Sequence, residues 1–122
     1  MMRLQPLFSI LLILDLICAG CASVPMSKPS LASRQQYIES NGSISFEIKQ
    51  AMIEGKVIKG MTKEQVIAAW GKPSEVLTWE ASKSLAEGEE SWWYNRYFNI
   101  FQPIFYINFK NSIVQYVEEI YK

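Results

Sequence analysis

Residues 60–73 carry signals for both ends of a short helix, and they constrain the fold more than any other stretch. Thr62 is the predicted N-cap, because its hydroxyl can accept a hydrogen bond from a backbone N–H group that the first turn leaves unpaired. Gln65 lies three residues later and completes a capping box. Met61 and Val66 occupy the two positions of a hydrophobic staple. The stretch therefore predicts a helix that begins just after Thr62.

The same stretch also marks where this helix ends. Gly71 is expected to close the helix in the left-handed conformation, and Pro73 prevents its continuation. The apolar residues recur on one side of the helix: Val66, Ile67, Ala69 and Trp70. A helix of this kind needs a second element to cover its apolar side.

A first helix is predicted from about Ser45 to Glu54, with Asn41, Ser43 and Ser45 as alternative N-caps. Apolar or small residues recur at helical spacing on one face: Ile44, Ile48, Ala51, Met52 and Gly55. Gly55 is expected to end this helix. Residues 56–60 then connect the two helices into a hairpin, with Val57 and Ile58 turned inward. The hairpin has one apolar side, which a sheet would cover.

Alternating apolar and polar residues after Pro73 predict four strands. The strands are expected at Val76–Glu80, Trp92–Tyr97, Ile104–Phe109 and Ile113–Ile120. The connections are a polar loop at Ala81–Glu90, a turn or bulge at Phe98–Pro103 and a tight turn at Lys110–Ser112, where Asn111 tolerates positive φ. The fold class is therefore α+β, a two-helix hairpin packed on a small antiparallel sheet of three to four strands, in the order of two helices and then four strands.

The large aromatic residues gather in the predicted sheet, where Trp70, Trp79, Trp93 and Phe105 are expected to be mostly structural. Both faces of the sheet contain apolar residues, while two short helices can cover only one face. Trp92 and Trp93 are adjacent on a strand and must point to opposite faces. We assign Trp93 to the core and Trp92, with Tyr94, to the uncovered face. An uncovered aromatic face is typical of a site for a partner.

Residues 1–20 are predicted to be a lipoprotein signal peptide. Arg3 supplies a positive charge, an apolar run follows, and small residues precede Cys21. A membrane span would need roughly 20 apolar residues, and Pro6 and Asp15 interrupt this shorter run. Cys21 is therefore the expected site of acylation, for example with palmitate. Residues 21–43 are predicted to be the lipidated N-terminus and a flexible tether, and residues 44–122 the folded domain.

The residues that remain after cleavage lack the groups that most enzymes use. The chain has no His, its single Asp lies in the signal peptide, and acylation would consume the Cys21 thiol. The commonest general base, the usual metal ligands and a Cys–His pair are thus missing. The sequence predicts no enzyme, no metal and no cofactor. Its 12 Lys+Arg balance its 12 Asp+Glu, which argues against nucleic acid as a partner.

The helix stretch resembles the signature of the SmpA/OmlA (BamE-like) family of bacterial outer-membrane lipoproteins. The matching residues are Gly60, Met61, Thr62, Gln65, Val66, Gly71 and Pro73, while Trp70, also a structural residue of this motif, stands where the family usually has a smaller aliphatic residue. The resemblance implies a lipid-anchored protein on the periplasmic face of the outer membrane. It also implies an accessory role in outer-membrane protein assembly or envelope integrity, with barrel-assembly subunits or phospholipid as partners.

A second hypothesis is an inhibitor-like or ligand-binding module displayed in the periplasm on the same lipid anchor. The predicted unit is similar to half of the β-lactamase inhibitory proteins, which bind through an aromatic sheet. Aromatic side chains of the later strands would serve as anchors for the partner, because Trp and Tyr dominate binding hot spots. These candidates are Trp92, Tyr94, Tyr97 and Tyr106.

Overall fold

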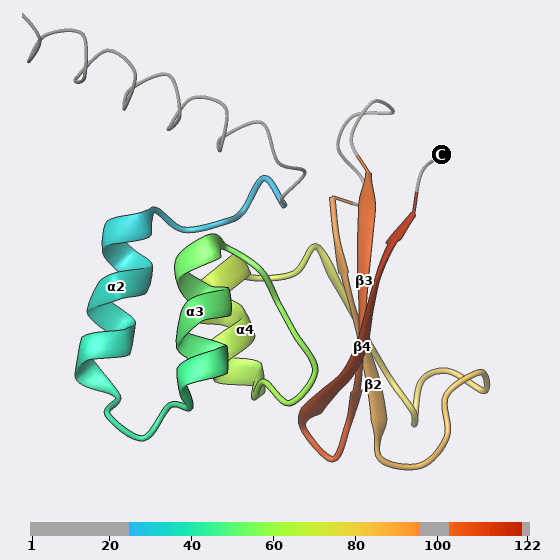
Figure 1. The fold of residues 1–122 in the computed structure, drawn as a ribbon. Coiled ribbons are helices and arrows are strands. Elements are labelled where there is room, and N and C mark those ends of the chain that lie inside the picture. Colours follow the sequence, from blue (N-terminus) through green and yellow to red (C-terminus); the bar gives the residue numbers. More distant parts are fainter. Residues whose placement is uncertain (1–24, 96–102, 121–122) are drawn as a thin grey trace, which may run out of the picture.

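The computed structural model describes residues 25–95 and 103–120, and within them it contains three helices and four strands (Figure 1). The helices are α2 (Leu31–Ser40), α3 (Phe46–Glu54) and α4 (Lys63–Trp70), and the strands are β1 (Glu75–Thr78), β2 (Glu89–Tyr94), β3 (Ile104–Lys110) and β4 (Ile113–Ile120). The predicted α+β class is confirmed. The predictions for residues 1–20, Cys21 and Tyr97 lie outside the described residues.

The four strands form one antiparallel sheet in the order β1-β2-β3-β4. A two-residue turn joins β3 to β4, and both of its residues have positive φ, 52° at Asn111 and 68° at Ser112. This confirms the predicted tight turn. Farther along, Asn108 pairs with Tyr116 but Phe109 pairs with Val114, so Gln115 is an extra residue that forms a bulge in β4.

All three helices lie on one side of the sheet (Figure 1). The core fills the space between the two layers, and its largest fully buried side chains include Met52, Met61, Val66, Tyr94, Ile107, Phe109 and Val114. Trp70 joins α4 to the sheet, because its ring packs edge-on against Tyr94 at 5.4 Å and Phe105 at 5.0 Å between centroids. Its Nε1 also donates to the Gly55 carbonyl at 2.8 Å, at the end of α3.

The predicted helix ends are largely confirmed. Thr62 and Gln65 form the complete capping box, and Ser45 is the N-cap of α3 among the three alternatives. Gly55 ends α3 in the left-handed conformation, with φ 74° and ψ 32°. Gly71 differs from the prediction, because its φ of 80° is positive but its ψ of −166° is extended. At this residue the chain leaves α4 directly toward the sheet.

Helix α2 corrects the prediction of a two-helix domain that begins after a flexible tether. Leu31–Ser40 is helical and packs against both α3 and α4. The buried Arg34 holds it there: Nε donates to the Met52 carbonyl at 2.8 Å and Nη2 to the Ile53 carbonyl at 3.2 Å. These carbonyls belong to the last turn of α3, and the Met52 carbonyl also accepts the Gly55 N–H at 3.1 Å. The helix is therefore fixed mainly by contacts to distant residues, and local periodicity does not reveal them.

β3 ends one residue later than predicted, at Lys110, and β1 and β2 differ more from their predicted bounds. β1 ends at Thr78, and Trp79 lies in the following turn with 40% of its surface exposed. The prediction that Trp79 is structural is therefore wrong. β2 begins at Glu89, inside the predicted loop, because Glu89 and Glu90 pair with the end of β3. Glu90 also forms an ion pair with Lys63 at 2.9 Å, and this contact links β2 to α4.

Candidate functional site

The two faces of the sheet carry different aromatic residues, and our assignment of the tryptophans is reversed. Trp92 and Tyr94 point toward the helices and are only 6% and 1% exposed. They pair across β3 with Ile107 and Phe105, which are buried on the same side. The Tyr94 hydroxyl donates to the Gly71 carbonyl at 2.8 Å. Trp92 and Tyr94 are therefore core residues, and the prediction that they contact a partner is wrong.

The face of the sheet that points away from the helices carries a line of three aromatic side chains, which we call the aromatic row. It consists of Trp93 on β2, Tyr106 on β3 and Tyr116 on β4. The ring centroids lie 4.7 Å apart for Trp93 and Tyr106 and 6.0 Å apart for Tyr106 and Tyr116. Trp93 and Tyr106 are half-buried, whereas Tyr116 is 46% exposed. No helix of residues 25–95 and 103–120 covers this face (Figure 1).

Polar groups lie beside the aromatic row. Partial burial, a side-chain hydrogen bond with Tyr106 and the nearby Glu118 and Glu89 raise the pKa of Tyr116 to about 12. Its phenol therefore stays protonated at neutral pH and can donate or accept a hydrogen bond. Beside it, the buried Asn108 donates from Nδ2 to Glu89 at 2.8 Å. The row thus combines ring faces with hydroxyl groups, and Trp and Tyr are enriched in protein-binding surfaces.

Sequence reasoning found one member of the row and missed two. Tyr106 was a predicted candidate and lies in it, while Tyr97 lies outside the described residues. Tyr116 was missed because strict alternation would place it on the same face as the buried Val114. The bulge at Gln115 moves it to the opposite face. Trp93 was missed because Trp92 and Trp93 are adjacent and chemically alike. Only the pairing of β2 with β3 decides which of the two faces the helices.

Residues 60–66, the first part of the motif at residues 60–73, hold α4 against the edge of the sheet. The Gly60 N–H donates to the Val114 carbonyl at 3.0 Å, and the Val114 N–H donates to the Met61 carbonyl at 2.9 Å. Thr62 adds a bridge to Ile113, while Met61 and Val66 are fully buried. These contacts explain why the motif contains small, apolar and capping residues in this order. The motif positions elements of the fold and offers no reactive group.

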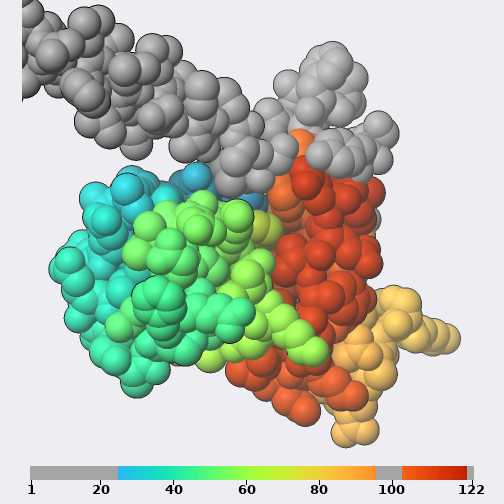
Figure 2. Space-filling view, in the orientation of Figure 1, coloured from blue at the N-terminus to red at the C-terminus, as the bar shows by residue number. Residues whose placement is uncertain are grey.

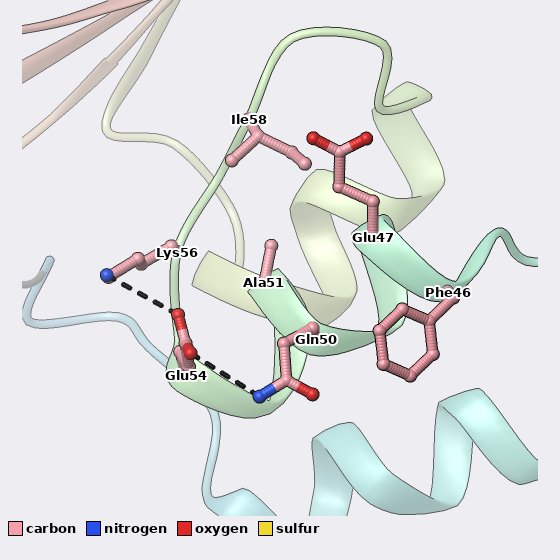
Figure 3. A pocket seen from close by; sticks show the side chains of 7 residues that line it. All are labelled: Phe46, Glu47, Gln50, Ala51, Glu54, Lys56 and Ile58. Atoms are coloured by element: carbon pink, nitrogen blue, oxygen red, sulfur yellow. Dashed lines mark hydrogen bonds and ion pairs between the residues drawn. The ribbon is translucent and has the colours of Figure 1, made fainter.

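A shallow groove of about 390 Å³ lies between α3 and the connector that follows it (Figure 3). Its lining residues are Phe46, Glu47, Gln50, Ala51, Glu54, Lys56 and Ile58. The Glu54 carboxylate lies 3.4 Å from Lys56 Nζ and 3.4 Å from Gln50 Nε2 (Figure 3). These contacts are exposed surface interactions, and the groove brings together no nucleophile with a base.

Within the described part of the chain, no group of three or more His, Cys, Asp or Glu side chains is placed to hold a metal ion. The helices of that same part are too short or too polar to span a bilayer. Comparison of the chain with models of protein families, with curated proteins and with solved structures finds no match.

Proposed function

We propose that this protein is a non-enzymatic lipoprotein that docks a partner on the face of its sheet that no described helix covers. Acyl chains on Cys21 would hold it on the periplasmic face of the outer membrane. There it acts as an accessory factor in outer-membrane protein assembly or envelope integrity. The aromatic row carries this proposal, because it places three aromatic side chains on a face that no described helix covers.

Physical reasons favour docking over a purely structural role for the row. Side chains that only stabilise a small domain are normally buried between its layers, as Trp70, Trp92 and Tyr94 are here. Tyr116 instead leaves 46% of its surface exposed on the outer layer. Burying such a ring against a partner gains hydrophobic free energy at a low cost in side-chain entropy.

The address and the biological role are supported by sequence resemblance. The apolar run before Cys21 resembles a lipoprotein signal, and the motif from Gly60 to Pro73 resembles the SmpA/OmlA (BamE-like) family. Several acyl chains bind a membrane firmly, whereas one does so only weakly. Because of the resemblance to this family, we propose barrel-assembly subunits as the first partners to test, with phospholipid as a second.

The aromatic row supports one alternative of a different class, an inhibitor-like or ligand-binding module on the same anchor. Aromatic sheets can bind an enzyme surface or a small ligand as well as an assembly subunit. The two functions predict different captured molecules, and one experiment separates them.

The test is affinity capture from detergent-solubilised envelopes with tagged wild-type protein and the double variant Tyr106→Ala/Tyr116→Ala. We expect the wild type to capture a defined partner and the double variant to capture at least tenfold less of it. Circular dichroism should show that the double variant keeps its fold. Ile67→Ala is the matched control, since Ile67 is 40% exposed on α4, away from the row.

The identity of the captured partner decides between the two functions. Barrel-assembly subunits support the assembly role, whereas a periplasmic enzyme or a small ligand supports the alternative. Equal capture by the wild type, the double variant and the control would contradict docking through the aromatic row. Acylation is tested separately, because Cys21→Ser should leave the protein unprocessed or released from the membrane.

A further inference from the structure

The described chain begins with a segment that is bound to the domain and does not hang free of it. We call residues 25–29 the anchor segment, because they follow the proposed acylation site. Pro25 is almost completely buried. The Met26 N–H donates to Asn95 Oδ1 at 3.0 Å, and the Ser27 hydroxyl donates to the Trp70 carbonyl at 2.6 Å. Arg34 adds a hydrogen bond to the Pro29 carbonyl.

The anchor segment docks at one end of the molecule, which we call the anchor end. The last residue of α4, Trp70, and the residue that follows β2, Asn95, lie there, because the segment contacts both. Asn95 Nδ2 in turn donates to the Pro103 carbonyl at 3.2 Å, just before β3 begins. The contacts are close: a Cβ atom on Gly71 would lie 2.4 Å from the Ser27 carbonyl oxygen. Figures 1 and 2 show these first described residues at the upper end, between the helices and the sheet.

The short covalent path from Cys21 to Pro25 limits how far the domain can stand from its anchor. Four residues span at most about 14 Å, since each adds no more than roughly 3.6 Å. We propose that the anchor end faces the lipid bilayer and is held within this distance of it. The proposal rests on acylation of Cys21, which belongs to the proposed function.

The exposed side chains at the anchor end suit a membrane surface. Met26 and Leu31 are apolar and 59% and 42% exposed, and Lys28 lies between them in sequence. Ile120 pairs with Ile104 at the same end and is 36% exposed. Apolar side chains beside a lysine match the boundary between acyl chains and phosphate headgroups.

The orientation has a consequence for the aromatic row. β3 starts at the anchor end and runs away from it, so the sheet stands upright on the membrane and its faces point sideways (Figure 1). Tyr106 is the third residue of β3 and lies about 7 Å along the strand from Ile104. The row therefore faces a neighbour in the same membrane and does not face the lipid.

The test uses two single-cysteine variants of the acylated protein in vesicles of phosphatidylethanolamine and phosphatidylglycerol. Ala32→Cys lies in the first turn of α2, near the anchor end, and Ser43→Cys lies beyond the last turn; both residues are exposed. The 10 residues of α2 separate the two ends by about 15 Å. Each thiol carries the same fluorophore, and the vesicles contain a lipid with a spin-labelled headgroup as quencher.

We expect at least twofold stronger quenching at residue 32 than at residue 43. A 12-residue Gly-Ser insertion after Ala22 should remove this difference, because a flexible spacer lets the domain move away and tumble. Equal quenching at both positions in the protein without the insertion would overturn the proposed orientation. A difference that survives the insertion would overturn the short tether as its cause.

Mass spectrometry of the same preparations keeps the two proposals apart. Acylated Cys21 with equal quenching contradicts only the orientation, and the lipoprotein assignment stands. A preparation from cells in which Cys21 carries no acyl chain contradicts the proposed function and, with it, this inference.

Discussion

Gly71 is the single residue at which helix α4, the sheet and the anchor segment meet. Its carbonyl accepts the Tyr94 hydroxyl, its φ is 80°, and the Ser27 carbonyl packs against its Cα. Any side chain at this position would face both a strained backbone and a backbone oxygen. The local sequence predicted that the helix ends at Gly71. The close approach of Ser27 to Gly71 could not be predicted, because it depends on how the N-terminal segment folds.

Gly71→Ala is therefore expected to destabilise the domain more than Gly60→Ala. Gly60 also has positive φ, at 96°, but no atom lies within 4 Å of the position that its Cβ would occupy. The control should lose about 1–2 kcal/mol from backbone strain alone. Gly71→Ala should lose clearly more in urea unfolding, because the anchor segment must also move. Equal losses for the two variants would contradict the packing of Ser27 against Gly71.

Two tyrosines make the stability of the domain sensitive to alkaline pH. Burial raises the pKa of Tyr94, and burial together with the Tyr106 hydrogen bond raises the pKa of Tyr116 to about 12. Folding thus favours the neutral phenols. Their contribution is fully present below pH 10, the usual value, and is lost as the pH rises through the folded-state pKa.

We expect the free energy of unfolding to fall between pH 10 and 12, and Tyr116→Phe to make this fall smaller. Urea unfolding at several pH values measures the effect, and absorbance of tyrosinate reports the ionisation directly. If Tyr116→Phe leaves the slope above pH 10 unchanged, the raised pKa of Tyr116 is wrong.

At the scale of elements, a buried guanidinium helps to hold helix α2, together with Tyr37 and Ile38, which pack against the core. Arg34 is 5% exposed and donates to the carbonyls of Met52 and Ile53 without an acidic partner in these contacts. The C-terminal end of a helix carries a partial negative charge, so a cation is favourable there. This arrangement attaches α2 to α3 through two carbonyls of the last α3 turn.

Arg34→Ala should destabilise the domain by about 1.5–3 kcal/mol, the usual value for hydrogen bonds to a charged group. Amide hydrogen exchange should rise first across residues 31–40, since α2 would detach before the core opens. Gln35→Ala is the control, because Gln35 is exposed on the same helix. Unchanged protection of α2 in Arg34→Ala would show that other contacts hold this helix.

The elements also show which parts of the fold the sequence predicts. Caps at Thr62, Ser45 and Gly55 follow from residues within four positions, and these predictions are confirmed. Helix α2 was missed, since a buried Arg in a polar stretch gives no apolar periodicity. The face of Tyr116 was missed because the bulge at Gln115 depends on pairing with β3. Local signals thus predicted the elements, whereas contacts between elements decided the candidate site.

At the scale of the whole molecule, the sheet separates a core face from a face without a described helix. Trp92→Ala should cost about 3–5 kcal/mol, because its ring is buried and packs on Phe109 at 4.6 Å between centroids. Trp93→Ala should cost less, since Trp93 is half-buried on the other face. Urea unfolding of both variants measures the difference. A larger loss for Trp93→Ala would reverse the assignment of the two faces.

The measurement that tests docking through the aromatic row most directly is site-specific photo-crosslinking in intact cells. A photoreactive benzoylphenylalanine replaces Tyr116 in one variant and Ile67 in the other, two residues with similar exposure of 46% and 40% on different sides of the molecule. We predict a discrete adduct with an envelope protein from residue 116 and none of comparable yield from residue 67. An adduct from residue 67 alone, or equal yields from both positions, would contradict the account.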